Sequence, residues 1–253
     1  MAYLYEVPSK KFLLDAEDVK VVNGIERKKI LAFGPHSDDL SIGAGGFLFH
    51  LSKKNTIVPV CGYSGWRGVN GAKSKKEAIL IREKEMAREA EVLGFKAPVF
   101  LRLNTYESDE EADKEKDKQK IKSLIEKQKP QLIFLPNPLD LHPRHKLLTQ
   151  LILAALSDLN VKEVSLIFYE IPWSVFSGNE FNYIVPLSSE LMRKKIEAIK
   201  VHKSQLVRTD FVKLAKALMS LRAGIVPEQK IGGYGSNLSL SNWVEVYEYK
   251  FKE

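Results

Sequence analysis

A histidine and two adjacent aspartates follow the first strongly apolar run of the chain. His36, Asp38 and Asp39 come directly after residues 30–34 and Pro35, and several glycines follow them. Imidazole nitrogen and carboxylate oxygen are both ligands of zinc, and a catalytic zinc site keeps three protein ligands and one open position. His36 and Asp39 could therefore hold one ion, while Asp38 accepts a proton from the attacking water. The alternative is a helix cap, and this stretch alone supports both interpretations equally.

Two further histidines, His142 and His145, lie three residues apart in the sequence DLHPRHKLL. The chain has five histidines, and three of them fall in these two clusters. This concentration favours a mononuclear metal site formed by His36, Asp39 and one histidine of the pair. The mixture of ligands suits zinc, although iron, manganese and cobalt remain open. The spare histidine could donate a hydrogen bond to a developing oxyanion.

The elements around these clusters alternate between strand and helix. Apolar runs bounded by turn-forming residues predict five strands, at 29–33, 56–65, 97–103, 131–138 and 165–173. Helical patterns separate them, at 45–55, 74–95, 118–130 and 145–159. This alternation predicts a parallel sheet with helices on both faces. Polar clusters follow the first four strands, where an open α/β sheet binds its ligands.

The alternation weakens beyond Trp173. A strand and an amphipathic helix are predicted within 181–206, a further helix at 210–225, and a last strand at 243–251. No internal repeat or linker is recognisable. We therefore expect a single domain over 1–253, with a core of about 29–175 and a C-terminal α+β elaboration of about 176–253.

Bulk composition is that of an ordinary globular protein. The 253 residues are 44% hydrophobic and 28% charged, and no apolar run is long enough to cross a bilayer. The N-terminal residues lack the pattern of a secretory signal. The single cysteine, Cys61, excludes an intrachain disulfide and fits a reducing compartment. These features predict a cytoplasmic enzyme without a membrane span.

The net charge of +7 would suit an anionic partner, including nucleic acid. Most lysines and arginines, however, alternate with acidic residues at helical spacing, as in KSKKEAILIREKE and KEKDKQKIKS. Such segments are typical of solvated helix faces. The sequence therefore predicts no nucleic-acid partner.

Taken together, PHSDD…GAGG and HPRH resemble the LmbE-like (PIG-L) family of zinc-dependent N-acetylglucosaminyl deacetylases. IREKEMAREAEVLGF is similar to the family's R-x-x-E helix, and KKIEAIKVHKSQ to its late K-x-x-A-I-x-x-H-x-S-Q signature. The resemblance covers roughly residues 29–205 in the family's order. It implies a Rossmann-like three-layer α/β sandwich with a mostly parallel sheet, in agreement with the alternation.

The resemblance also implies a role for each residue of the two clusters. The family's zinc ligands correspond to His36, Asp39 and His145, its general base to Asp38, and its transition-state-stabilising histidine to His142. The implied activity is removal of an acetyl group from an N-acetylated amino sugar by metal-assisted amide hydrolysis. The implied partner is a small soluble N-acetylated sugar, and a homo-oligomer is expected because family members often form one.

Five further residues are candidate substrate contacts. Arg82 corresponds to an arginine that contacts substrate in the family. Trp66 and Tyr106 follow predicted strands, where an aromatic ring can stack on a sugar or equally serve the core. Arg144 adds a positive charge that could favour a phosphorylated substrate. His202 matches the late signature and could border the site or be a structural histidine.

The chain departs from the family pattern at three positions, namely Ser37, Leu40 and Arg144, where the family has proline, an acidic residue and aspartate. None of these changes removes a predicted ligand or the base. Loss of an acid at Leu40 could weaken support for the metal. An alternative function is therefore a catalytically inactive protein that binds a sugar or nucleotide in the same crevice.

Overall fold

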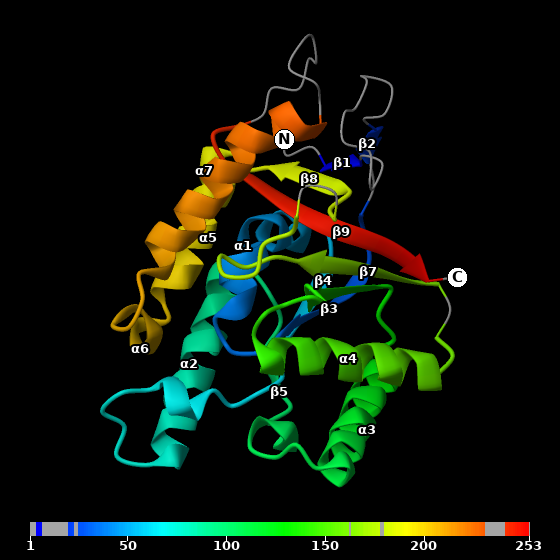
Figure 1. Ribbon diagram of the computed structural model, residues 1–253, viewed down its shortest axis with the longest axis vertical. Coiled ribbons are helices and arrows are strands. Elements are labelled where there is room, and N and C mark those ends of the chain that lie inside the picture. The colour runs from blue at the N-terminus through cyan, green and yellow to red at the C-terminus, as the bar shows by residue number, and fades with distance from the viewer. Residues whose placement is uncertain are drawn as a thin grey trace.

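The computed structural model describes residues 4–6, 20–22, 25–161, 163–177, 180–230 and 241–252, and these form one sheet between two layers of helices (Figure 1). The sheet has nine strands in the order β2-β1-β8-β9-β7-β6-β3-β4-β5. No helix in this described part of the chain is both long and apolar enough to cross a membrane.

Five neighbouring strands of the sheet are parallel, as the alternating pattern predicted. They are β3 (Lys29–Gly34), β4 (Thr56–Cys61), β5 (Val99–Phe100), β6 (Leu132–Pro136) and β7 (Val164–Tyr169). Each pairs in parallel with its neighbour in the order β5-β4-β3-β6-β7. The predicted α/β class with a parallel core is confirmed.

Four strands extend this core in antiparallel fashion along the β7 edge. They are β9 (Val244–Lys252), β8 (Tyr183–Pro186), β1 (Leu4–Glu6) and β2 (Lys20–Val22). The sequence predicted β8 and β9 but not β1 and β2, because three-residue strands show no periodicity. The C-terminal elaboration thus joins the same sheet as the core, while the single-domain boundaries stay a prediction.

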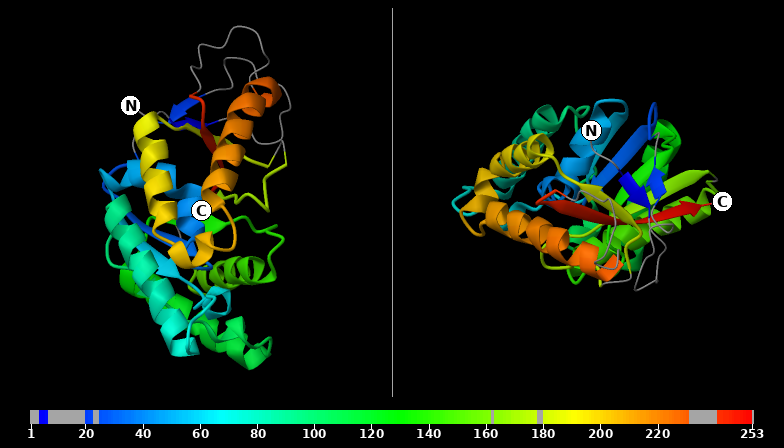
Figure 2. Two further views of the ribbon diagram at one scale, coloured as in Figure 1. Left: turned by 90° about the vertical axis from the view of Figure 1, so that its left-hand side faces the viewer. Right: turned by 90° about the horizontal axis from the view of Figure 1, so that it is seen from above.

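Helices cover both faces of the sheet (Figure 2). One face packs against α1 (Asp39–Ser52), α2 (Lys75–Leu93), α5 (Ser189–Lys200) and α7 (Phe211–Lys230), and the other against α3 (Glu111–Gln128) and α4 (Pro143–Asp158). Successive residues of β3 serve opposite cores: Ile30 and Ala32 belong to the first, Leu31 and Phe33 to the second. This alternation follows from the period of two in a strand.

A buried ion pair fastens α1 to the C-terminal part of the chain. Lys195 and Glu245 are almost completely buried and their charged groups lie 2.8 Å apart. Lys195 Nζ also donates to Ile42 O at 2.6 Å, and Glu245 accepts from the backbone N–H groups of Gly46 and Phe47 at 3.1 and 2.8 Å. Because each charge has several partners, the pair holds the backbone of α1 in place.

Candidate metal centre

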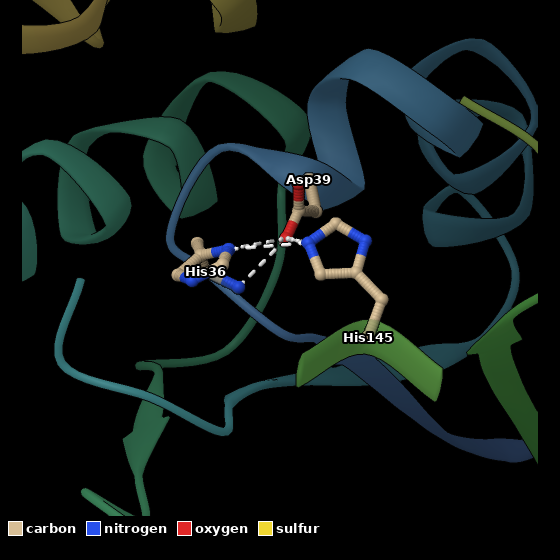
Figure 3. A group of neighbouring side chains, drawn as sticks. All are labelled: His36, Asp39 and His145. Atoms are coloured by element: carbon tan, nitrogen blue, oxygen red, sulfur yellow. Dashed lines mark hydrogen bonds and ion pairs between the residues drawn. The ribbon is translucent and has the colours of Figure 1, made fainter. Parts of the chain in front are cut away.

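The two predicted polar clusters meet at the switch point of the sheet. β3 and β6 are neighbours, but the chain continues from β3 to β4 on one side and from β6 to β7 on the other. Loops that follow two such strands leave a crevice between them, which is where open α/β sheets bind ligands. His36 and Asp39 follow β3, and His145 enters from the first turn of α4, after β6 (Figure 3).

The three side chains converge as a compact triangle of ligand atoms. His36 Nδ1 lies 3.2 Å from His145 Nε2, and Asp39 Oδ2 lies 3.4 Å from each of these nitrogens. Zinc bonds of about 2.0–2.1 Å at tetrahedral angles place neighbouring ligands about 3.3–3.4 Å apart. The triangle therefore fits one face of a tetrahedral zinc site. Among the residues that the structure describes, this is the one group identified as able to hold a metal ion.

Charge and burial at the triangle favour a cation. Burial alone would raise the pKa of Asp39, but His145 and His36 hold it well below its usual value. Burial would likewise lower the pKa of His145, yet Asp39 and Asp140 raise it above its usual value. The directions of both pKa shifts are those of a buried site in which histidines lie beside carboxylates. A divalent metal ion would supply the positive charge beside these carboxylates and leave the histidines neutral.

Asp140 orients His145 and was not identified from the sequence. Its Oδ2 lies 2.9 Å from His145 Nδ1, and its Oδ1 accepts from the backbone N–H of His142 at 2.8 Å. With Nδ1 donating to the carboxylate, Nε2 of His145 presents a lone pair to the triangle. Metal-binding histidines commonly have such a partner. The only signal in the sequence was a carboxylate just ahead of the H-x-x-H segment.

An Asp140→Asn variant should bind zinc about 10–100-fold more weakly, because the amide removes the charge that fixes and polarises His145. A competition titration with a chromophoric chelator measures this affinity. Asp109→Asn is a suitable control, since Asp109 is an exposed carboxylate outside the triangle. An unchanged zinc affinity in Asp140→Asn would assign Asp140 to loop structure alone.

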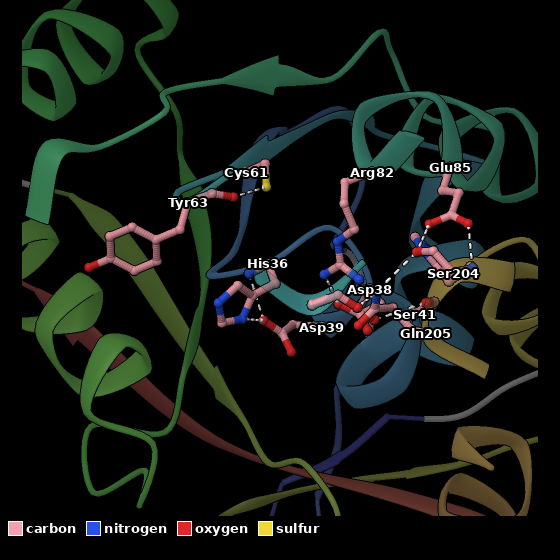
Figure 4. Close-up of polar contacts among 12 residues, drawn as sticks. His36, Asp38, Asp39, Ser41, Cys61, Tyr63, Arg82, Glu85, Ser204 and Gln205 are labelled. Atoms are coloured by element: carbon pink, nitrogen blue, oxygen red, sulfur yellow. Dashed lines mark hydrogen bonds and ion pairs between the residues drawn. The ribbon is translucent and has the colours of Figure 1, made fainter. Parts of the chain in front are cut away.

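The Asp38 side chain pairs with Arg82 instead of capping α1. It holds the N-cap position of α1, but its side chain makes no capping hydrogen bond. Its Oδ1 instead accepts from Arg82 Nη2 at 2.8 Å, and both side chains are buried (Figure 4). Burial would lower the pKa of Arg82, and the contact with Asp38 raises it. The helix-cap interpretation of Asp38 is thereby replaced by a buried ion pair beside the triangle.

Arg82 approaches the site closely and keeps spare donors. Its Nε and Nη1 have no hydrogen-bond partner among the described residues. A Cβ at Gly65 would lie 3.2 Å from Arg82 Nε and 3.4 Å from His36 Cδ2, and Gly65 has a φ of +61°. Glycine at this position therefore serves both the turn and the close approach of Arg82. Contact between Arg82 and substrate stays a prediction.

His142 stacks on the triangle from the solvent side. Its ring centroid lies 4.5 Å from that of His145 and 5.5 Å from that of His36. Its Nδ1 accepts from the backbone N–H of Arg144 and so caps α4. The proton of the neutral ring must then sit on Nε2, which is the form that the predicted oxyanion donor needs. Burial, followed by the neighbouring histidines, lowers the pKa of His142 and favours this neutral form.

Of the two predicted aromatic contacts, Tyr106 lies beside the triangle. Tyr106 meets His36 edge-on, with ring centroids 6.2 Å apart. Trp66 is turned toward the surface, where its Nε1 donates to Glu107 and Arg67 lies 5.5 Å above its ring. Arg67 also lies 5.6 Å from the Tyr106 ring and was not identified from the sequence. Sugar stacking by Trp66 and Tyr106 stays a prediction.

The two remaining candidate contacts are engaged with the protein itself. Arg144 Nη1 pairs with Asp109 at 2.6 Å, which partly offsets its charge. His202 is buried, and its Nε2 lies 2.7 Å from Glu89 Oε2 on α2. This contact with Glu89 is what the alternative role of His202, that of a structural histidine, requires. Substrate contact by Arg144 and His202 stays a prediction.

The late signature that contains His202 fastens the C-terminal part to α2. Ser204 donates from its backbone N–H and its hydroxyl to Glu85, both at 2.7 Å. Gln205, beside Ser204 in Figure 4, donates to Gly68 O at 3.1 Å, in the segment that follows β4. Because Arg82 and Glu85 share α2, these contacts fix the helix that places Arg82 against Asp38.

The Leu40 side chain lies in the core and is not part of the triangle. Its side chain is fully buried within the cluster between the sheet and α1. A Cβ at Gly34 would lie 3.2 Å from Leu40 Cγ, so the side chain packs beneath the end of β3. The missing acid at this position therefore removes no group from around the triangle.

Exposed apolar side chains lie on the loops that follow β6 and β7, which are joined by a hydrogen bond from Leu141 N–H to Ser174 Oγ. Leu139 and Leu141 of the loop after β6 are 63% and 79% exposed, and Val175 is 48% exposed. Trp173 of the second loop lies beside the triangle, with its ring centroid 6.4 Å from that of His145. The sequence did not single out these side chains, because an exposed apolar residue in a loop carries no periodic signal.

Comparison with known proteins agrees with this geometry. The sequence profile of the PIG-L family, described as GlcNAc-PI de-N-acetylase, matches residues 31–156. A diacetylchitobiose deacetylase of Thermococcus kodakarensis is 30% identical over an alignment of 191 residues, and the match covers 70% of this chain and 70% of the relative.

Two solved structures are similar in fold. The N,N'-diacetylchitobiose deacetylase of Pyrococcus horikoshii has a TM-score of 0.68 at 24% identity, covering 88% of this chain and 84% of that one. GalB, the 4-carboxy-2-hydroxymuconate hydratase of Pseudomonas putida, has a TM-score of 0.69 at 17% identity, covering 89% and 97%. The hydratase illustrates that this fold alone does not determine the reaction.

Proposed function

The chain belongs to the PIG-L (LmbE-like) family and is a metal-dependent deacetylase, from which we propose that it uses zinc to remove the acetyl group from an N-acetylated amino sugar of the N-acetylglucosamine type. The observation that carries the proposal is the triangle of His36, Asp39 and His145 with Asp38 directly beside it. A relative named for deacetylation of diacetylchitobiose supports the sugar substrate.

The triangle and its neighbour divide the chemistry between them. A divalent cation held by His36, Asp39 and His145 would polarise the acetyl carbonyl and make a water more acidic. Asp38 takes the proton from the attacking water and returns it to the departing nitrogen, so that acetate and a free amine are formed. Arg82 orients the Asp38 carboxylate, because its Nη2 donates to Oδ1 at 2.8 Å.

His142 supplies the hydrogen bond for the oxyanion of the tetrahedral intermediate. The backbone N–H of Arg144 engages its Nδ1, so Nε2 carries the proton that it donates. A donor of this kind contributes most when it is held in place before the reaction, which the stacking on His145 provides.

The walls of the crevice suit a sugar that carries further groups. Tyr106 at the edge of His36 would pack against the sugar ring, and Trp66 would extend that wall. Arg144 would reach an anionic substituent if the substrate displaced Asp109. The family's substrate type, together with this polar and aromatic wall, supports a small soluble N-acetylated sugar as the partner.

An acetate-release screen tests the proposed function. N-acetylglucosamine, its phosphorylated forms and diacetylchitobiose are incubated with zinc-loaded protein, and Asp38→Asn serves as the matched control. We expect acetate from at least one of these sugars and little from the variant. Equal rates on neutral and phosphorylated sugars would remove the role of Arg144. Zinc-loaded protein that releases no acetate from any sugar would contradict the substrate assignment.

The structure weakens one argument for the alternative function, a catalytically inactive protein that binds a sugar or nucleotide. This alternative was suggested by the departures at Leu40 and Arg144, and of these Leu40 is packed in the core. An oligomeric state and a cytoplasmic location stay predictions.

A further inference from the structure

A second hollow lies at the other end of the central strands, where β3 and β4 begin. Its volume is about 650 Å³, which falls within the range of small-ligand sites. Five of the residues that line it are cationic, namely Arg27, Lys28, Lys29, Lys53 and Lys54, and no acidic residue lines it. Nothing in the deacetylase chemistry uses these residues.

The positive charge of the hollow is only partly neutralised. Lys53 pairs with Glu190 at 3.1 Å, and Lys54 pairs with Glu26. Within the described parts of the chain, Arg27, Lys28 and Lys29 have no ion-pair partner. The C-terminal end of α1 accounts for Lys53 and Lys54, because cations are favoured there. It does not account for the other three, of which Arg27 and Lys28 precede β3 and Lys29 is its first residue.

The backbone that presents these cations is firmly held. Asn55 accepts from the backbone N–H of Lys28 at 2.9 Å and donates to Ile25 O and Leu51 O at 2.8 and 2.9 Å. Arg27 has a φ of 56°, an unfavourable left-handed conformation for a residue with a Cβ, and its N–H donates to Lys54 O at 2.9 Å. Unfavourable backbone conformations of this kind occur often at ligand sites.

We propose that this hollow binds a small soluble ligand that carries two or more linked phosphate groups. Three cations without an ion-pair partner among the described residues suit such a ligand, since every linked phosphate carries at least one negative charge at pH 7. The Arg27 guanidinium offers paired donors to phosphate oxygens, and the lysines add point charges. Gln131 and Thr56 line the same hollow and supply neutral polar groups.

The phosphate hollow is separate from the metal centre. β3 runs from Lys29 at the hollow to Gly34 at the crevice, and at about 3.3 Å per residue these ends lie about 17 Å apart. A ligand in the hollow therefore does not touch the triangle. The proposal stands independently of the sugar that the enzyme deacetylates.

Isothermal titration calorimetry with sodium tripolyphosphate tests the proposal. We compare the wild-type protein with Arg27→Asn/Lys28→Gln, which removes two unpaired cations and keeps a residue that tolerates a positive φ. Lys84→Gln/Lys216→Gln is the matched control, because it removes the same charge from exposed positions on α2 and α7. Thermal unfolding of all three proteins checks that they are folded.

We expect one tripolyphosphate per chain, binding about tenfold or more weakly in the hollow variant and almost unchanged in the control. Affinity should fall between about 50 mM and about 200 mM salt. No binding by the wild type would overturn the proposal, as would equal losses in both variants. Citrate binding as tightly as tripolyphosphate, or binding only to vesicles of anionic phospholipid, would also overturn it.

Discussion

An Asp39→Ala variant should lose its zinc and release acetate about 10³-fold more slowly than the wild type. Asp39 supplies the single negative charge of the triangle, and its Oδ2 lies 3.4 Å from each ligand nitrogen. A bound metal contributes several kcal/mol of transition-state stabilisation, and about 1.4 kcal/mol corresponds to a factor of ten in rate. Metal content after dialysis and acetate release under excess substrate measure the two effects.

The matched control is Asp158→Ala, which removes a carboxylate at the far end of α4. It should keep both zinc and activity. Asp39 also accepts from the backbone N–H of His36 at 2.7 Å, so circular dichroism must show that the variant is folded. A folded Asp39→Ala protein that retains stoichiometric zinc would disprove the ligand set.

An Asp38→Asn variant should keep its zinc but lower kcat by about 10²- to 10⁴-fold, the usual contribution of a general base. Asparagine has the same size as aspartate and can still accept from Arg82 through its amide oxygen. It cannot take a proton from water. Since the triangle is intact in this variant, metal content and the KM for the sugar should change little.

This pair of variants separates the two aspartates by function. Asp39→Ala should fail to hold metal, whereas Asp38→Asn should hold metal and fail to turn over substrate. Activity that survives in Asp38→Asn would remove Asp38 from the role of base. Loss of zinc in Asp38→Asn would show instead that the Arg82 contact maintains the triangle.

The sequence predicted the parallel core because each strand and helix leaves its own periodic signature. β1 and β2 escaped prediction because three residues are too few for a pattern. The antiparallel edge also depends on pairing between distant segments, such as β7 with β9. Such pairing is set by the packing of the whole sheet and not by local residue preferences.

The candidate site was predictable as far as residue types at strand ends allow. His36, Asp39 and His145 were identified, and the structure brings them together. Asp140 was missed, because its role depends on the direction of one side chain toward His145. Leu40 could not be interpreted either, since only the packing shows that it points into the core.

The Lys195–Glu245 pair has a consequence for how the enzyme is made. During synthesis, all three predicted metal ligands are present in the nascent chain once His145 has been added. Glu245, which accepts hydrogen bonds from the backbone of α1, is added about a hundred residues later. Until then, Lys195 would lack its carboxylate partner, and α1 would lack the hydrogen bonds that Glu245 accepts from its backbone. Metal capture by the nascent chain should therefore be weak and reversible until Glu245 has emerged, and tight retention of the metal should follow that point.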